Sequence, residues 1–119
     1  MLRRVVLALL LCAPLAAATN APRPPPVNVS GDYHSNWDDV RLVQDGDRVI
    51  GTYVCCGGGR IEGKIYEGRV LRYRWDQPGA WGLGVWTIDG TQLRGTWGHQ
   101  RDAVGGGRWD LERVTRLAQ

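Results

Sequence analysis

The sequence predicts an all-β fold, an eight-stranded antiparallel up-and-down β-barrel. Three observations predict it: short runs in which apolar and polar residues alternate, turn sequences such as Asp-Gly between the runs, and the absence of helical periodicity. Connections this short join only antiparallel neighbours, so consecutive strands lie side by side. Eight such strands can close into a barrel, which leaves no sheet edge exposed.

Eight runs can be counted along the chain. They lie near Val29–Ser35, Asp39–Gln44, Arg48–Val54, Arg60–Tyr66, Arg69–Asp76, Gly82–Ile88, Gln92–Gly98 and Gly107–Val114. Hairpin turns, which need positive φ, are predicted at Asp45-Gly46, Glu67-Gly68 and Asp89-Gly90. An internal repeat supports the count, because the pattern of residues 45–53 recurs 44 residues later at residues 89–97. Two half-barrels of four strands each would explain this repeat.

The alternation within each run predicts which side chains face the interior. In the seventh run, Leu93, Gly95 and Trp97 share the inward face, whereas Arg94 and Thr96 face water. The same parity places these further residues inside: Val49, Gly51, Tyr53, Ile61, Gly63, Ile65, Leu71, Tyr73, Trp75, Trp109 and Leu111. Inward glycines weaken a strand, but they permit the sharp coiling that a narrow barrel requires.

Residues 1–18 have the features of a cleaved signal peptide. Arg3 and Arg4 precede an apolar run from Val5 to Leu11, and Ala16-Ala17-Ala18 supplies the small residues that a signal peptidase needs. The apolar run is too short for a membrane span, which takes about 20 residues. No later stretch is apolar enough to be a membrane helix. We therefore expect a secreted or periplasmic protein that does not span the membrane.

Beyond the cleavage site, the sequence divides into a proline-rich, extended leader at residues 19–27 and the barrel domain at residues 28–116. Cleavage also lowers the charge. Removing Arg3 and Arg4 leaves 13 of the 15 basic residues against 12 acidic residues, so the net charge falls from +3 to +1. A charge this small gives no reason to expect nucleic acid as a partner.

The first and last runs carry a recognisable pair of motifs, Gly31-Asp32-Tyr33 and Trp109–Arg113. This pattern resembles the calycins, the group of small β-barrels that contains the avidins and lipocalins. The resemblance implies that Arg113 stacks on the ring of Tyr33 and closes the barrel, a contact worth about 0.5–2 kcal/mol. It does not imply biotin binding, because Ser35–Asp39 stands where avidins have the Asn and Ser that hold biotin.

Inward aromatic side chains suggest a pocket for a small apolar or aromatic ligand. Eight strands enclose enough space for side chains or for one small ligand, so the rings could instead simply fill the barrel. The sequence leaves both interpretations open. The predicted ligand-binding residues are Tyr33, Tyr53, Tyr73, Trp75, Trp86 and Trp97.

Cys55 and Cys56 are the cysteines that follow the signal peptide, and three glycines come directly after them. Adjacent cysteines on an extended strand point to opposite faces, so a vicinal disulfide needs a distorted turn, which the glycines would allow. An intermolecular disulfide and two inert thiols are the other possibilities. Structural zinc usually takes four Cys or His ligands. Because His34 and His99 are not spaced to complete such a set, we expect no metal.

The candidate catalytic groups do not form a recognisable set. Two serines and two histidines follow the signal peptide, and His34 falls on the outward parity of its run. No nucleophile, base and orienting group can be assembled from them. We therefore expect a protein that is not an enzyme and needs no cofactor.

The leading hypothesis is an exported small β-barrel that binds a small apolar or aromatic ligand at the barrel mouth. One alternative is a protein-binding module such as a protease inhibitor, in which a loop or the proline-rich leader makes the contact. Another is a carbohydrate-binding barrel that uses Trp37 and Trp81, each eight residues before the first Asp of its repeat.

Overall fold

The computed structural model describes residues 26–115. The predicted signal peptide, residues 1–18, lies outside the described part of the chain, as do residues 19–25 of the predicted leader. Within residues 26–115, no helix is long and apolar enough to cross a membrane.

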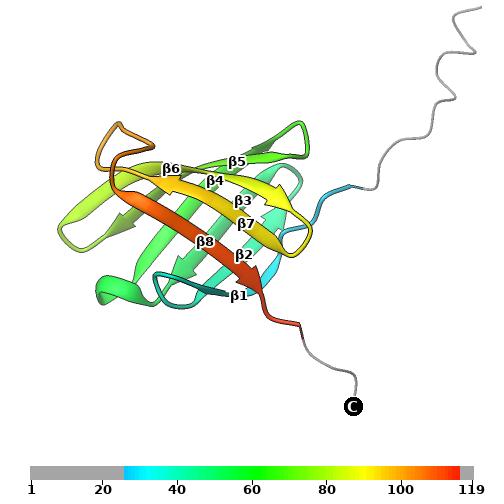
Figure 1. Ribbon diagram of the computed structural model, residues 1–119, viewed down its shortest axis with the longest axis horizontal. Helices are drawn as coiled ribbons and strands as arrows, with labels where there is room; N and C mark the ends of the chain where they lie inside the picture. The colour runs from blue at the N-terminus through cyan, green and yellow to red at the C-terminus, as the bar shows by residue number, and fades with distance from the viewer. Residues whose placement is uncertain (1–25, 116–119) are drawn as a thin grey trace, which may run out of the picture.

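Eight strands form one closed antiparallel barrel in which each strand pairs with its neighbours in sequence and β1 pairs with β8 (Figure 1). The strands are β1 (Gly31–Ser35), β2 (Val40–Asp45), β3 (Arg48–Tyr53), β4 (Gly59–Tyr66), β5 (Val70–Gln77), β6 (Ala80–Asp89), β7 (Gln92–Trp97) and β8 (Gly107–Arg113). A short 3-10 helix, η1 (Cys55–Gly57), lies between β3 and β4. The predicted fold, strand number and strand order are confirmed.

The three predicted hairpin turns are present. Gly46 and Gly90 adopt positive φ between paired strands, at 65° and 61°. The β4–β5 turn needs two consecutive left-handed residues, and both Glu67 (φ 55°) and Gly68 (φ 64°) adopt this conformation. Turns with this twist match the right-handed twist of the flanking strands, which is why such short connections can close the hairpins.

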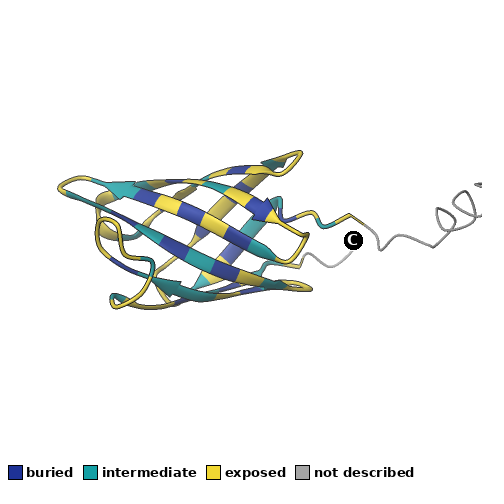
Figure 2. Ribbon diagram, turned by 90° about the horizontal axis from the view of Figure 1, so that it is seen from above, coloured by how far each residue is buried: buried dark blue, intermediate teal, exposed yellow. Residues whose placement is uncertain are grey.

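Burial alternates along the strands as the parity predicts, and Figure 2 shows this as alternating bands along the barrel wall. The buried apolar residues are Val29, Tyr33, Val40, Leu42, Val49, Tyr53, Ile61, Ile65, Leu71, Tyr73, Trp75, Trp86, Leu93, Trp109 and Leu111. The inward glycines Gly51, Gly63 and Gly95 are half-buried, and so is one inward aromatic residue, Trp97. It ends β7, where the strand reaches an end of the barrel, so fewer neighbours cover its ring.

The two ends of the barrel differ. One end carries the turns after β2, β4 and β6 and is closed by the segment before β1. Val29 of this segment is 1% exposed, its N–H donates to the side chain of Gln44 (2.8 Å), and its carbonyl accepts a hydrogen bond from the Tyr33 hydroxyl (2.7 Å). The segment from Val27 to Ser30, part of which was predicted as strand, therefore seals this end.

The contact expected between Tyr33 and Arg113 is present at the junction of β1 and β8. The two residues are cross-strand partners, and the Arg113 guanidinium donates a hydrogen bond to the Tyr33 hydroxyl (3.0 Å). The guanidinium carbon lies 5.5 Å from the centre of the tyrosine ring. Arg113 also donates to the carbonyl of Asn28, so it ties the sealing segment to the strand pair that closes the barrel.

Candidate functional site

The opposite end of the barrel is open and contains a pocket of about 80 Å³, which we name the mouth pocket. It lies among the ends of β3, β5 and β7, the start of β8 and the loops at residues 36–39, 54–58, 78–79 and 98–106, which we name the mouth loops. The pocket is lined by Trp37, Tyr53, Cys55, Cys56, Trp75, Gln77, Trp97, His99 and Trp109. Five of these nine side chains are therefore tyrosine or tryptophan.

The pocket rings meet edge to face. Trp97 lies at the centre, with its ring centre 5.6 Å from those of both Trp37 and Trp75, at interplanar angles of 89° and 85°. Tyr53 and Trp109 form a similar pair at 5.2 Å and 84°. Aromatic rings prefer this arrangement because the positive edge of one meets the negative face of the other.

Two glycines, Gly59 of β4 and Gly106 of the β7–β8 loop, lie against two of these rings. A Cβ atom placed on Gly59 would overlap Cζ, Oη and Cε1 of Tyr53, and one on Gly106 would overlap three atoms of the Trp97 indole. A point that close to three connected atoms lies above the ring, so each ring lies flat on its glycine. Tyr53 and Trp97 occupy equivalent positions in the sequence repeat, which therefore has a structural counterpart.

The indole N–H groups are mostly used within the protein. Those of Trp37 and Trp75 donate to the backbone carbonyls of Arg108 (2.9 Å) and Gly98 (3.1 Å). That of Trp109 donates to the Ser35 hydroxyl at 3.1 Å. These bonds fix the orientation of the rings.

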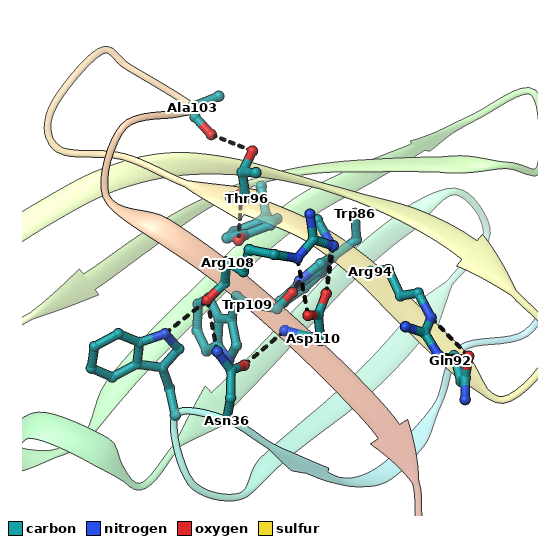
Figure 3. Close-up of polar contacts among 12 residues, drawn as sticks. Asn36, Trp86, Gln92, Arg94, Thr96, Ala103, Arg108, Trp109 and Asp110 are labelled. Carbon is teal, nitrogen blue, oxygen red and sulfur yellow. Dashed lines mark hydrogen bonds and ion pairs between the residues drawn. The ribbon is translucent and has the colours of Figure 1, made fainter.

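Asn36 holds the loop that carries Trp37. Its side-chain N–H donates to the Arg108 carbonyl (2.9 Å), and its side-chain oxygen accepts from the backbone N–H of Asp110 (2.8 Å), as the dashed lines in Figure 3 show. The Asn36 side chain thus extends the pairing of β1 with β8 by one step beyond Ser35. The position of Trp37 at the pocket edge is fixed by these contacts.

The predicted ligand-binding residues divide into two groups. Tyr53, Trp75 and Trp97 line the mouth pocket, whereas Tyr33, Tyr73 and Trp86 lie outside its lining. Trp86 is 0% exposed and stacks on Tyr73 with a ring separation of 3.9 Å, so this pair fills the interior. The first group therefore lines a pocket at the end of the barrel, and the second group fills its interior.

Six lining residues are absent from the predicted ligand-binding set, namely Trp37, Gln77, His99, Trp109 and the two cysteines of the predicted disulfide. A signal for the first three was present in the sequence. In an up-and-down barrel, the connections after the first, third, fifth and seventh strands must meet at one end, and these residues lie in or beside those connections. The predicted strand order therefore implies that Trp37, Gln77 and His99 lie at the same end of the barrel.

Trp37 and Trp81, paired by the carbohydrate hypothesis, have different surroundings. Trp37 is 40% exposed and lines the mouth pocket. Trp81 lies on β6, and the Arg74 guanidinium carbon is 4.3 Å from the centre of its ring. The two tryptophans therefore do not have equivalent surroundings, although they occupy equivalent positions in the sequence repeat.

Cys55 and Cys56 form part of the pocket wall, and their sulfur atoms are paired as a vicinal disulfide. The turn that brings them together is left-handed at Cys56 (φ 68°) and continues through Gly57 and Gly58 with φ of 89° and 88°. The glycines therefore supply the backbone conformation that adjacent paired cysteines require. Among residues 26–115, no group of three or more His, Cys, Asp and Glu side chains could hold a metal ion.

The Tyr53 hydroxyl provides a polar group near the pocket. It donates to the side-chain oxygen of Gln77 at 2.8 Å and lies 3.4 Å from the Asp76 carbonyl. Burial raises the pKa of Tyr53 to about 12, and the negative charge of Asp76 adds to the rise.

Tyr53 is expected to make the stability of the barrel fall above pH 10. Because its pKa lies above the ordinary value of 10.0, the folded state holds this proton more tightly than the unfolded state. The stabilisation that comes from the raised pKa of Tyr53 is fully present in the free energy of unfolding below pH 10, and it is lost between pH 10 and about pH 12. Urea denaturation across this range, on the wild type and Tyr53→Phe, measures the effect. Identical pH dependence in the two proteins would contradict it.

No protein-family model, curated protein or solved structure matches the chain. The closed eight-stranded antiparallel barrel is compatible with the calycin architecture that the sequence resembles.

Proposed function

We propose that the chain is an exported binding module that takes the apolar or aromatic part of a small molecule into the mouth pocket. The observation that carries this proposal is the asymmetry of the barrel. One end is sealed by the segment around Val29, and the other opens into a pocket with five aromatic side chains in its wall. Export is inferred from the signal-peptide features of the sequence.

The exposure of the pocket aromatics supports binding. Trp37 is 40% exposed, and Trp97 is half-buried although it faces the interior. Covering apolar surface gains about 25 cal/mol for each Å² removed from water. Small-ligand sites are typically concave and apolar with a few polar groups, and here Gln77 and His99 are the polar members of the wall. A ligand that covers these rings would gain both hydrophobic and aromatic contact energy.

Tryptophan fluorescence and thermal stability, measured across a panel of small molecules, test the proposal. The panel contains indole, benzyl alcohol, cyclohexanol, choline and glucose, and we expect saturable changes with an apolar or aromatic member. Trp37→Ala should weaken this binding, whereas the matched Trp81→Ala, which removes a tryptophan outside the pocket lining, should not. If no compound changes either signal, or if both variants bind as the wild type does, the proposal is wrong.

A further inference from the structure

The mouth pocket presents aromatic faces. Tyr53 lies flat on Gly59 of β4 and Trp97 lies flat on Gly106 of the β7–β8 loop, so the opposite face of each ring turns away from that glycine. A Cβ atom on Gly82 would likewise lie 2.7 and 2.8 Å from two atoms of the Trp75 indole. The face of an aromatic ring carries the negative part of its quadrupole.

The angles between the rings favour a compact group over a flat one. A flat ligand fits best between parallel rings, whereas the pairs Trp37–Trp97, Trp75–Trp97 and Tyr53–Trp109 are within about 6° of perpendicular. Perpendicular rings form corners in which a rounded group touches several surfaces together.

The charges around the mouth pocket suit a cation. No lysine or arginine among residues 26–115 lines it. The mouth loops contain Asp38, Asp39 and Asp102 against Arg101, which gives them a net charge of 1 − 3 = −2. All four residues are exposed, so their field reaches an approaching ligand.

The hydrogen-bonding groups of the pocket argue for a cation that carries no N–H. A primary ammonium ion needs several acceptors when it leaves water. Within the described part of the chain, no Asp or Glu lines the pocket, and the side-chain oxygen of Gln77 already accepts a hydrogen bond from the Tyr53 hydroxyl. A nitrogen surrounded by methyl groups has no such need, and aromatic faces are its usual partners in proteins.

From these features we propose that the mouth pocket binds the trimethylammonium group of a free, small quaternary ammonium compound. The inference rests on the proposed function, because it names the chemical class of the ligand for the same pocket. The methyl groups supply the apolar surface, and the positive charge is stabilised by the faces of the surrounding rings.

Calorimetric titration of the full chain with choline and with 3,3-dimethylbutan-1-ol tests this proposal. The second compound has the shape of choline with a carbon atom in place of the charged nitrogen. We expect choline to bind about tenfold more tightly, because only choline gains cation–π energy. Trp37→Leu, which keeps apolar bulk but removes a ring, should weaken choline binding about fivefold and change binding of the alcohol less than twofold. Trp81→Leu is the matched control and should bind both compounds as the wild type does.

The outcomes separate the two proposals. If the neutral alcohol binds as tightly as choline, or if indole binds and choline does not, the quaternary ammonium proposal is overturned and the proposed function stands. If no compound of either panel binds, both are overturned. Recovery of the protein with sedimented phosphatidylcholine vesicles would overturn the assignment to a free compound, in favour of a lipid headgroup.

Discussion

Replacement of Trp86 by alanine is expected to lower the free energy of unfolding by about 3–5 kcal/mol. The indole is 0% exposed, stacks on Tyr73 and meets Trp109 edge to face at 5.2 Å. Its N–H donates to the backbone carbonyl of Trp109 at 2.8 Å. Truncation therefore leaves a large cavity and an unpaired carbonyl in the middle of the core. Small domains have a total stability of about 5–15 kcal/mol, so the variant should be close to unfolding.

Urea denaturation monitored by circular dichroism measures this loss. Trp86→Phe keeps a ring against Tyr73 but removes the hydrogen bond, so its loss should be smaller than that of Trp86→Ala. Thr87→Ala, at the adjacent exposed position, should stay within about 0.5 kcal/mol of the wild type. A loss below about 1 kcal/mol for Trp86→Ala would show that the interior is not packed around this ring.

Strand alternation was sufficient to predict the barrel and its inside. In β5, for example, Leu71, Tyr73 and Trp75 are buried, and Arg72 and Arg74 between them are exposed, as the parity predicts. This works because a one-residue slip in register would exchange the two faces of a strand, so the pattern and the pairing determine each other. Turn residues such as Gly46 and Gly90 then fix the hairpins.

Parity could not predict which inward rings line a pocket. It treats Trp86 and Trp97 alike, although one is in the middle of β6 and the other ends β7. The distinction depends on depth along the barrel axis and on which end is closed. Which end is closed depends in turn on Val29. This residue is buried in the barrel, and its backbone N–H donates a hydrogen bond to the side chain of Gln44. Such contacts between distant segments are not periodic, so alternation carries no information about them.

Replacement of Gly95 by alanine is expected to cost about 3 kcal/mol, although it adds a single methyl group. Gly95 is the cross-strand partner of Trp86 on one side and of Trp109 on the other. A Cβ atom at this position would overlap the carbonyl oxygen of Val85 and lie 2.8 Å from its carbonyl carbon. The obstacle is the backbone of β6, which cannot move aside as a flexible side chain could. Strands β6 and β7 would have to separate locally, which weakens their hydrogen bonds and the packing of the two indoles.

Gly90→Ala distinguishes this steric effect from the general cost of replacing a glycine. Gly90 has positive φ (61°), but no atom lies within 4 Å of an added Cβ, so its replacement should cost about 1 kcal/mol from backbone conformation alone. Urea denaturation of both variants gives the comparison. A smaller loss for Gly95→Ala than for Gly90→Ala would contradict the close approach of β6 to β7. A larger loss for Gly95→Ala would show that this inward glycine is needed for the space it leaves, because the backbone of Val85 and Trp86 occupies the position of its missing side chain.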